Sequence, residues 1–255
     1  MTALFGLSLR SEEQCAFDPE LLPDFCRALE LPGTVLDTHA AEPWSAFCRR
    51  SGIGWGVRDL LDPALARTLV VAEELVAFEA LRKLDDRAEA AFGHGAKWAS
   101  LDLDVSGAVK SDDRREKLYA LLRQTGGILG RSAPGLTLFL PVRVPPPPGA
   151  GADAAELLRF MHGLPLPGVR FVFELYPHEP GALEWRCGEV LRFESRNWRV
   201  CFSPASGNYL KADVLHRFFG DDDLPPEPLS VLFSPEGGAP DEFLFARLEK
   251  AVFAG

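Results

Sequence analysis

Short apolar runs that each end in a polar residue alternate with amphipathic stretches along the whole chain. Eight such runs occur: Ala3–Arg10, Thr34–His39, Ile53–Arg58, Trp98–Asp104, Leu136–Arg143, Val169–Glu174, Trp198–Ser203 and Leu229–Ser234. Strands that alternate with helical patterns are typical of βαβ units and a parallel sheet. Eight units in 255 residues match the usual length of a closed barrel of eight strands and eight helices. The sequence therefore predicts an α/β fold, a single (β/α)8 TIM barrel domain that spans residues 1–255.

The stretches between the apolar runs predict the outer helices. Apolar residues recur at helical spacing within Pro19–Leu29, and Pro32 with the glycine after it predicts the end of that helix. Asp62 is a suitable N-cap for a long helical region over Pro63–Phe92. A final helix is expected over Asp241–Phe253.

Composition and charge narrow the class of partner. The net charge of −10 and the isoelectric point near 5.1 argue against a nucleic-acid surface, which needs a basic stripe. The five cysteines are widely spread without a CxxC pair, which indicates reduced thiols: Cys15, Cys26, Cys48, Cys187 and Cys201. Neither a secretory signal nor a membrane span is apparent, so we expect a cytoplasmic protein without membrane partners.

Alternation along the strands predicts which side chains face the barrel axis. Because active sites of such barrels lie at the carboxyl ends of the strands, the inward polar residues there are candidates for function. The predicted ring contains Arg10, Asp37, His39, Arg58, Asp102, Asp104, Arg143, Glu174, Ser203 and Ser234. These residues could also simply be solvated or pair with one another. Buried charges are costly unless they are paired or used, which favours a functional ring.

Two of the last βα-loops share the pattern Phe-Ser-Pro-x-x-Gly. Ser203, Ser206 and Gly207 belong to the first copy, and Ser234 and Gly237 belong to the second. Loops seven and eight of such barrels often bind phosphate through backbone N–H groups, although proline and glycine are also ordinary turn residues.

The neighbouring loops add a cation and a histidine. Arg10, on the adjacent first strand, could supply charge to an anion held at these loops. His178 in the sixth loop is a further candidate for acid–base work, although it could equally be a surface residue.

Three features carry a resemblance: the eight βα units, the segment AKWASLDLD after a long helical region, and PGVRFVFELYPHEP around the sixth strand. In these features the chain resembles the xylose isomerase-like barrel superfamily. This resemblance implies a sugar or sugar-phosphate isomerase or epimerase. It also implies a divalent metal held by Glu, Asp or Glu, His, and Glu from strands five to eight. Only Glu174 on strand six matches that set, because Pro141, Ser203 and Ser234 stand near the other positions.

Three hypotheses stay open from the sequence. In the first, the chain is an isomerase or epimerase acting on a small polyol, with Glu174 as base and His39, Asp102 or His178 assisting. In the second, the barrel has lost catalysis and binds a sugar-like or anionic ligand, with Arg10, Arg58 and Arg143 among its contacts. In the third, Asp104 and Glu174, with Asp102 and His39, form a relocated metal centre. The cofactor is otherwise unknown, and a homodimer is possible.

Overall fold

The strands of the computed structural model form a closed barrel. It describes residues 3–38, 40–70, 74–144, 156–157, 159–160, 163–164, 166, 168–179, 197–202 and 229–253. Eight parallel strands pair in the order β1-β2-β3-β4-β5-β6-β7-β8, and β8 closes onto β1. The predicted (β/α)8 barrel is therefore confirmed.

Seven of the predicted strands overlap an observed strand, and the second does not. The observed strands are β1 (Ala3–Ser8), β2 (Cys26–Pro32), β3 (Gly54–Arg58), β4 (Trp98–Ser100), β5 (Thr137–Val144), β6 (Val169–Leu175), β7 (Asn197–Phe202) and β8 (Leu229–Pro235). Leucines and phenylalanines on the outward faces of these strands, such as Leu29, Leu140, Phe173 and Phe233, are fully buried. The main core therefore lies between the barrel and the helices.

The prediction for the second strand was wrong. Residues Cys26–Pro32, which include the end of the helix predicted over Pro19–Leu29, form β2, and Gly33–Asp37 form the 3-10 helix η3 that follows it. A helix over Pro19–Leu29 would contain Pro23, which lacks an N–H and whose ring would clash with the carbonyl four residues earlier. Only Pro19–Leu21 is helical there, as the 3-10 helix η2.

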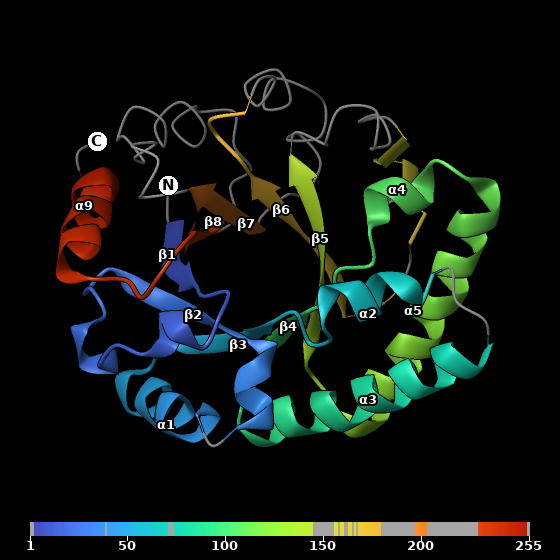
Figure 1. Ribbon diagram of the computed structural model, residues 1–255, viewed down its shortest axis with the longest axis horizontal. Helices are drawn as coiled ribbons and strands as arrows, with labels where there is room; N and C mark the ends of the chain where they lie inside the picture. Colours follow the sequence, from blue (N-terminus) through green and yellow to red (C-terminus); the bar gives the residue numbers. More distant parts are fainter. Residues whose placement is uncertain are drawn as a thin grey trace.

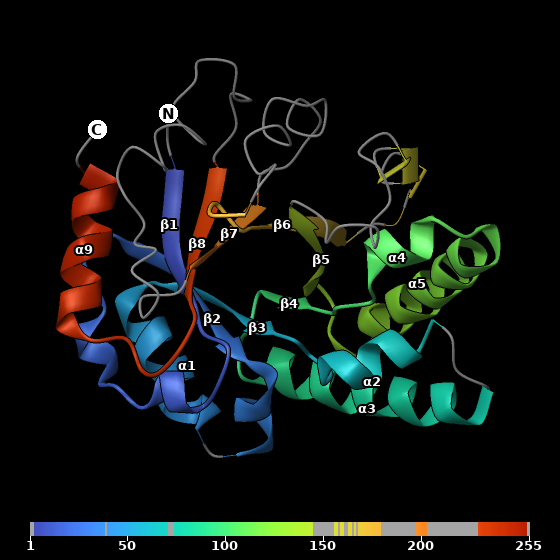
Figure 2. The ribbon, with the colours of Figure 1, turned by 45° about the horizontal axis from the view of Figure 1, so that its top comes forward.

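Helices surround the barrel on its outer side (Figures 1 and 2). They are η1 (Glu13–Cys15), α1 (Ala41–Ser51), α2 (Pro63–Thr68), α3 (Glu74–Gly93), α4 (Val105–Val109), α5 (Asp112–Ser132) and α9 (Glu242–Phe253). The long predicted helix over Pro63–Phe92 is divided into α2 and α3. Asp62 caps α2 as expected, since its carboxylate accepts hydrogen bonds from the backbone of Ala64 and Leu65.

The fourth strand is shorter than predicted. β4 ends at Ser100, so Asp102 and Asp104 lie beyond the strand. Asp104 has a φ of 48° and caps α4, where its carboxylate accepts a hydrogen bond from Gly107. Both aspartates therefore lie in the connection between β4 and α4, past the end of the strand.

Small residues make room inside the barrel for one large ring. Trp98 lies across Gly56, where an added Cβ would be 2.3 Å from the indole Nε1. Gly6 packs so closely on the carbonyl of Ala28 that a Cβ there would be 2.1 Å from the oxygen. These two glycines allow the indole and the neighbouring strand to close the lower part of the barrel.

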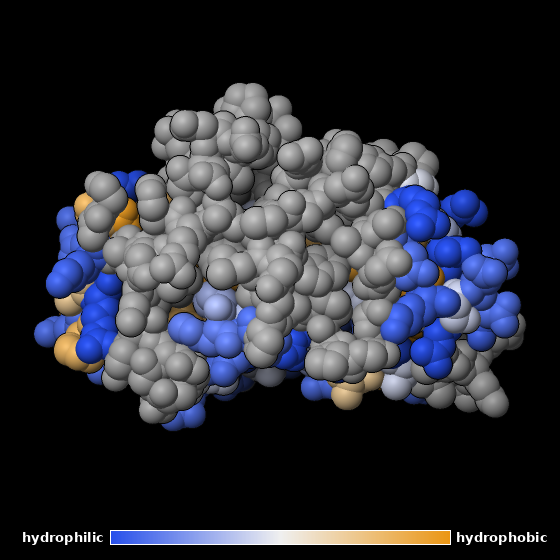
Figure 3. Space-filling model, turned by 90° about the horizontal axis from the view of Figure 1, so that it is seen from above, coloured by the Kyte–Doolittle hydropathy of each residue, from blue (hydrophilic) through white to orange (hydrophobic). Residues whose placement is uncertain are grey.

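No helix in the described part of the chain is long and apolar enough to cross a bilayer. Seen from above, hydrophilic residues gather over the end that carries α4 and α5, and hydrophobic side chains stand among hydrophilic ones on the α9 side (Figure 3).

Candidate functional site

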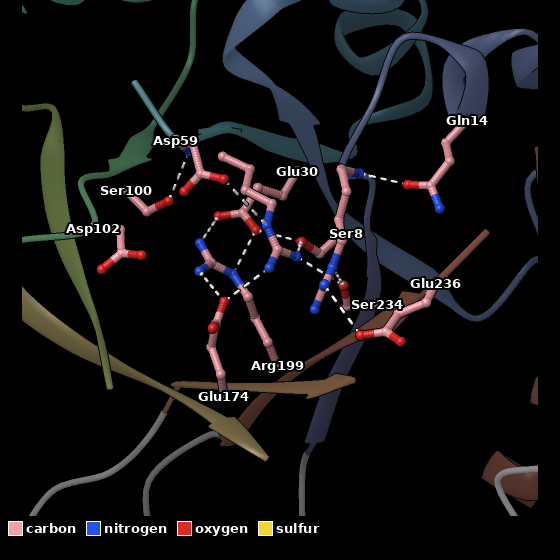
Figure 4. Close-up of polar contacts among 12 residues, drawn as sticks. Ser8, Gln14, Glu30, Asp59, Ser100, Asp102, Glu174, Arg199, Ser234 and Glu236 are labelled. Atoms are coloured by element: carbon pink, nitrogen blue, oxygen red, sulfur yellow. Dashed lines mark hydrogen bonds and ion pairs between the residues drawn. The ribbon is translucent and has the colours of Figure 1, made fainter. Parts of the chain in front are cut away.

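Four charged side chains meet on the barrel axis: Glu30 of β2, Arg58 of β3, Glu174 of β6 and Arg199 of β7 (Figure 4). We call them the axial ion-pair cluster. Their side chains are 1%, 6%, 15% and 0% exposed, in that order. The cluster contains two carboxylates and two guanidinium groups, so its formal charge is balanced.

Glu30 is the most enclosed acid of the cluster. Its carboxylate accepts hydrogen bonds from Arg199 Nε at 2.7 Å and Nη2 at 2.5 Å, which form a two-pronged contact. Ser8 Oγ and Trp98 Nε1 donate to the same carboxylate at 2.6 Å and 3.3 Å. Burial alone would raise the pKa of Glu30, but Arg199, and then Arg58, outweigh it and hold the pKa below its ordinary value. Glu30 is therefore a fixed anion.

Glu174 lies between the two arginines. Its Oε1 accepts from Arg58 Nη2 at 2.8 Å and from Arg199 Nη1 at 3.1 Å. Burial opposes ionisation here as well, yet Arg58 and Arg199, with Arg10 behind them, lower the pKa of Glu174. A carboxylate held ionised in this way is a strong hydrogen-bond acceptor and a weak base.

Arg58 also connects the cluster to the first and last strands. Its Nη1 donates to Ser8 Oγ at 2.8 Å and to Ser234 Oγ at 2.7 Å. Asp59 follows it with a φ of 56° and places its carboxylate 3.7 Å from Arg58 Nε. Burial raises the pKa of Asp59, and Arg58 opposes that rise. Gly33 packs against this turn, and a side chain there would clash, since a Cβ on Gly33 would lie 2.1 Å from the Asp59 carbonyl oxygen.

A second polar group lies at the rim, around Arg10. Arg10 donates to Ser234 Oγ at 3.1 Å, to Glu236 at 3.2 Å and to the hydroxyl of Tyr176 at 3.4 Å. Gln14 fixes the eighth loop by donating to the carbonyls of Pro235 and Gly237, each at 2.9 Å. The eighth loop is thus held by side chains of the first βα-loop.

A pocket of about 260 Å³ opens at the carboxyl ends of β4, β5 and β6. Its lining combines carboxylates, guanidinium groups, a phenol and a few small side chains: Arg67, Asp102, Asp104, Val105, Ser106, Pro141, Arg143, Glu174 and Tyr176. Arg143 stacks over the Tyr176 ring at 4.4 Å and pairs with Glu179. Partial burial raises the pKa of Asp104. Glu174 reaches both this pocket and the axial cluster.

The structure brings together many of the residues that the sequence singles out. Glu174, Arg58 and Ser234 lie within the barrel, Arg10 and Gly237 lie at its rim, and Asp102, Asp104 and Arg143 line the pocket. His178 is exposed in the turn after β6. His39, Ser203, Ser206 and Gly207 lie outside the described residues, so their predicted roles stay predictions.

The inward placement of Asp37 was wrong. It lies in η3, is 56% exposed and pairs with Arg87 of α3. The error follows from the misplaced second strand, which put Asp37 where Glu30 stands in the observed barrel.

Two residues of the cluster were missed from the sequence. Glu30 was hidden because its segment was predicted as a helix. Arg199 lies on a strand that was predicted correctly, and it shares strand parity with Cys201. Applying the alternation along the whole strand, and not only at its end, would have placed Arg199 inside the barrel.

The metal set that the resemblance implies does not fit the described residues. Pro141 on β5 and Ser234 on β8 offer no carboxylate, and the Glu174 Oε1 atom already accepts from two guanidinium groups. A cation at Glu174 would stand beside two positive charges. Asp102, a member of the relocated centre, pairs with Arg67. In the described part of the chain, no three His, Cys, Asp or Glu side chains gather as a metal site would need.

Comparison of the structure with solved structures places the fold. No family model matches the sequence, and no curated protein matches it. The fold, a closed barrel of eight parallel strands, is similar to that of solved sugar epimerases and xylose isomerase domain proteins. The chain is similar to a 3-keto-D-glucoside 4-epimerase from E. coli, with 14% identity, coverage of 98% of this chain and 99% of that chain, and a TM-score of 0.60.

Two further structures are similar over nearly their whole length. One is a xylose isomerase domain protein from Alicyclobacillus acidocaldarius, with 14% identity, coverage of 97% of this chain and 98% of that chain, and a TM-score of 0.59. The other is xylanase 10B from Thermotoga maritima, with 13% identity, coverage of 98% and 95%, and a TM-score of 0.59. Since these proteins carry different names for their reactions, the shared fold leaves the chemistry to the site.

Proposed function

We propose that this protein binds a neutral, sugar-like polyol in the pocket at the mouth of the barrel. The observation that carries the proposal is the lining: Asp102, Asp104 and Glu174 offer acceptors, while Arg143 and Tyr176 offer donors. Hydroxyl groups of a sugar both donate and accept, so they suit such a mixed lining. The pocket, at about 260 Å³, lies just below the roughly 300 Å³ where drug-sized ligand sites begin, which favours a monosaccharide-sized ligand.

The pairing of the arginines favours a neutral sugar over a sugar phosphate. Arg10 faces Glu236, Arg58 faces Glu174, Arg67 faces Asp102 and Arg143 faces Glu179. A phosphate would have to displace a carboxylate from one of these guanidinium groups. The lining of the pocket also holds more carboxylates than guanidinium groups.

The lowered pKa of Glu174 favours a role of this residue in binding a ligand over a role as a catalytic base. A general base works best when its pKa is near the operating pH. Arg58 and Arg199 lower the pKa of Glu174, so it accepts a hydrogen bond from a ligand hydroxyl but has little tendency to take the proton. This supports the second hypothesis from the sequence, a sugar-like ligand bound without turnover.

An isomerase or epimerase is the second candidate function, and one observation favours it. Asp104, whose pKa is raised, and Glu174, whose pKa is lowered, line the same pocket. Carboxyl groups whose pKa values are pushed apart are typical of acid–base pairs. In this candidate Asp104 moves the proton and Glu174 orients the sugar. The similarity to a 3-keto-D-glucoside 4-epimerase is compatible with it.

A ligand titration tests the proposal. Chelator-treated protein is titrated with D-xylose, D-fructose and D-tagatose, and separately with fructose 6-phosphate, while Tm is measured. A ligand that binds only the folded state raises Tm in a saturable way. We expect a neutral sugar to do so, and expect Arg143→Ala and Tyr176→Phe to weaken it. Arg170→Ala is the control, because Arg170 is exposed on the same strand as Glu174.

Two results separate the candidates. Binding of the phosphorylated sugar alone, or binding that ignores Arg143→Ala and Tyr176→Phe, would refute the proposed site. Incorporation of deuterium from D2O at a carbon of the bound sugar, lost in Asp104→Asn, would establish turnover and favour the second candidate.

A further inference from the structure

The axial ion-pair cluster has a feature that the proposed sugar site does not explain. Two arginines from strands that are not neighbours, Arg58 on β3 and Arg199 on β7, converge on one oxygen of Glu174. Figure 4 labels Arg199 and Glu174 at this contact. The Arg199 side chain is 0% exposed and that of Arg58 is 6% exposed. Burying two guanidinium groups is costly unless each is paired and hydrogen-bonded.

The donors of both arginines are used on the barrel axis. Arg199 donates from Nε and Nη2 to Glu30 and from Nη1 to Glu174. Arg58 donates from Nη2 to Glu174 and from Nη1 to Ser8 and Ser234. The two positive charges therefore face Glu30 and Glu174 at hydrogen-bond distance, two hydroxyl groups complete the shell, and the Asp59 carboxylate lies 3.7 Å from Arg58 Nε.

We infer that the guanidinium groups of Arg58 and Arg199 take the place of a divalent cation on the axis of this barrel. They supply two positive charges to the one carboxylate, Glu174, that matches the metal set implied by the resemblance. Glu30 supplies the further negative charge that the second guanidinium needs. Arg199 is thus a positioning residue: it fixes Glu174 and, with Arg58, keeps metal ions from the axis.

Charge and space both support this exclusion. A divalent ion bound to the Glu174 Oε1 atom would have to displace hydrogen bonds of 2.8 and 3.1 Å and would leave two buried guanidinium groups short of a partner. Leaving one charge of a buried pair alone is strongly destabilising. The inference concerns the axis and does not depend on which ligand the mouth pocket binds.

The first test uses the unaltered protein. After chelator treatment and dialysis against Mn²⁺, Mg²⁺, Co²⁺ or Zn²⁺, the metal content is measured by elemental analysis and Tm is recorded at rising metal concentration. We expect far less than one metal ion per chain and no saturable rise in Tm. One ion per chain with a saturable rise in Tm that Glu174→Gln abolishes would overturn the inference. No sugar is present, so this result stands apart from that of the sugar titration.

The second test replaces the cation from solution. Arg199→Ala removes one guanidinium, and methylguanidinium or methylammonium is then added at the same tens-of-millimolar concentrations. We expect the variant to lose about 10 °C in Tm and methylguanidinium to recover part of that loss in a saturable way. Arg170→Ala is the matched control, since Arg170 is exposed and donates to the carbonyl of Val169. Its Tm should stay near that of the parent and not respond.

The alternative outcomes of the second test are also decisive. Equal stability of Arg199→Ala and Arg170→Ala, or recovery of Arg199→Ala by Mn²⁺ and not by methylguanidinium, would contradict the assigned role. If Arg199→Ala does not fold, Arg199→Lys takes its place, because it keeps one charge without the two-pronged contact. That variant should fold with a lower Tm, and an unchanged Tm would count against the inference.

Discussion

Removing the positive charge of Arg199 tests how strongly the axial ion-pair cluster stabilises the barrel. The Arg199 side chain is 0% exposed and donates to Glu30 at 2.7 and 2.5 Å and to Glu174 at 3.1 Å. Removing one partner of a buried pair costs roughly 3–5 kcal/mol, because the remaining charge stays buried. We expect Arg199→Met to lower the free energy of unfolding by about 4 kcal/mol, which corresponds to about 10 °C in Tm for a domain of this size.

The companion variants separate the pairing from the loss of packing. Glu30→Gln alone is expected to cost about 2–3 kcal/mol, since it removes charge-assisted hydrogen bonds but leaves Arg199 paired with Glu174. In the double variant both charges are gone, and replacement of a buried pair by neutral side chains is often close to neutral. The double variant should therefore lose less than the sum of the single variants, by at least about 3 kcal/mol.

Urea unfolding of the four proteins at pH 7, followed by tryptophan fluorescence and circular dichroism, measures these differences. Arg170→Met is the control for loss of an arginine from an exposed strand position. Additive single effects, or a loss below about 1 kcal/mol in Arg199→Met, would refute the reasoning, since exposed ion pairs contribute at most about that much.

Further outcomes follow from a close packing contact, a helix cap and two buried acids. Gly56→Ala should lower the free energy of unfolding by roughly 1–3 kcal/mol, because the added Cβ would lie 2.3 Å from the Trp98 indole. Combining it with Trp98→Phe should recover part of that loss. Equal stability of Gly56→Ala and the parent would contradict this close contact. Asp62→Ala should cost about 1 kcal/mol by loss of the α2 cap, whereas Asp62→Asn, which can still accept, should cost less. The free energy of unfolding should fall as the pH drops below the ordinary range of a glutamate, because the pKa of Glu30 is lower in the folded protein than in the unfolded chain. Asp59 has a raised pKa, so its contribution to stability grows as the pH falls from that raised pKa toward the ordinary value of an aspartate. Asp59→Asn removes this contribution, so the free energy of unfolding measured with urea should fall more steeply with falling pH in that window, and a shallower fall would contradict this sign.

The barrel could be predicted from the sequence because its signal is distributed over the whole chain. Seven apolar runs overlap observed strands, and the strand order of a closed barrel then follows from sequence order. The second strand could not be found in this way. Leu21, Leu22, Phe25 and Leu29 happen to recur at helical spacing, although Pro23 interrupts that pattern.

The candidate site was predicted only in part, because the alternation pattern was applied only at the carboxyl end of each strand. Glu174, Arg58 and Ser234 were found because they stand at the carboxyl ends of strands. Glu30 and Arg199 lie further down the barrel, where apolar side chains are the usual filling. These two residues neutralise each other through a contact between distant strands. The sequence alone does not show which residues of distant strands lie side by side.

The charges on the axis also link the two halves of the chain. β1–β4 carry Glu30 and Arg58, β5–β8 carry Arg199 and Glu174, and each acid bonds to an arginine of the opposite half. In either half alone, Glu30 lacks Arg199 and Arg58 lacks Glu174, so of the charged contacts among these four residues only that between Glu174 and Arg199 is present. Closure of the ring therefore brings the remaining charges to their partners. Two halves produced as separate chains should accordingly bind each other through these complementary contacts.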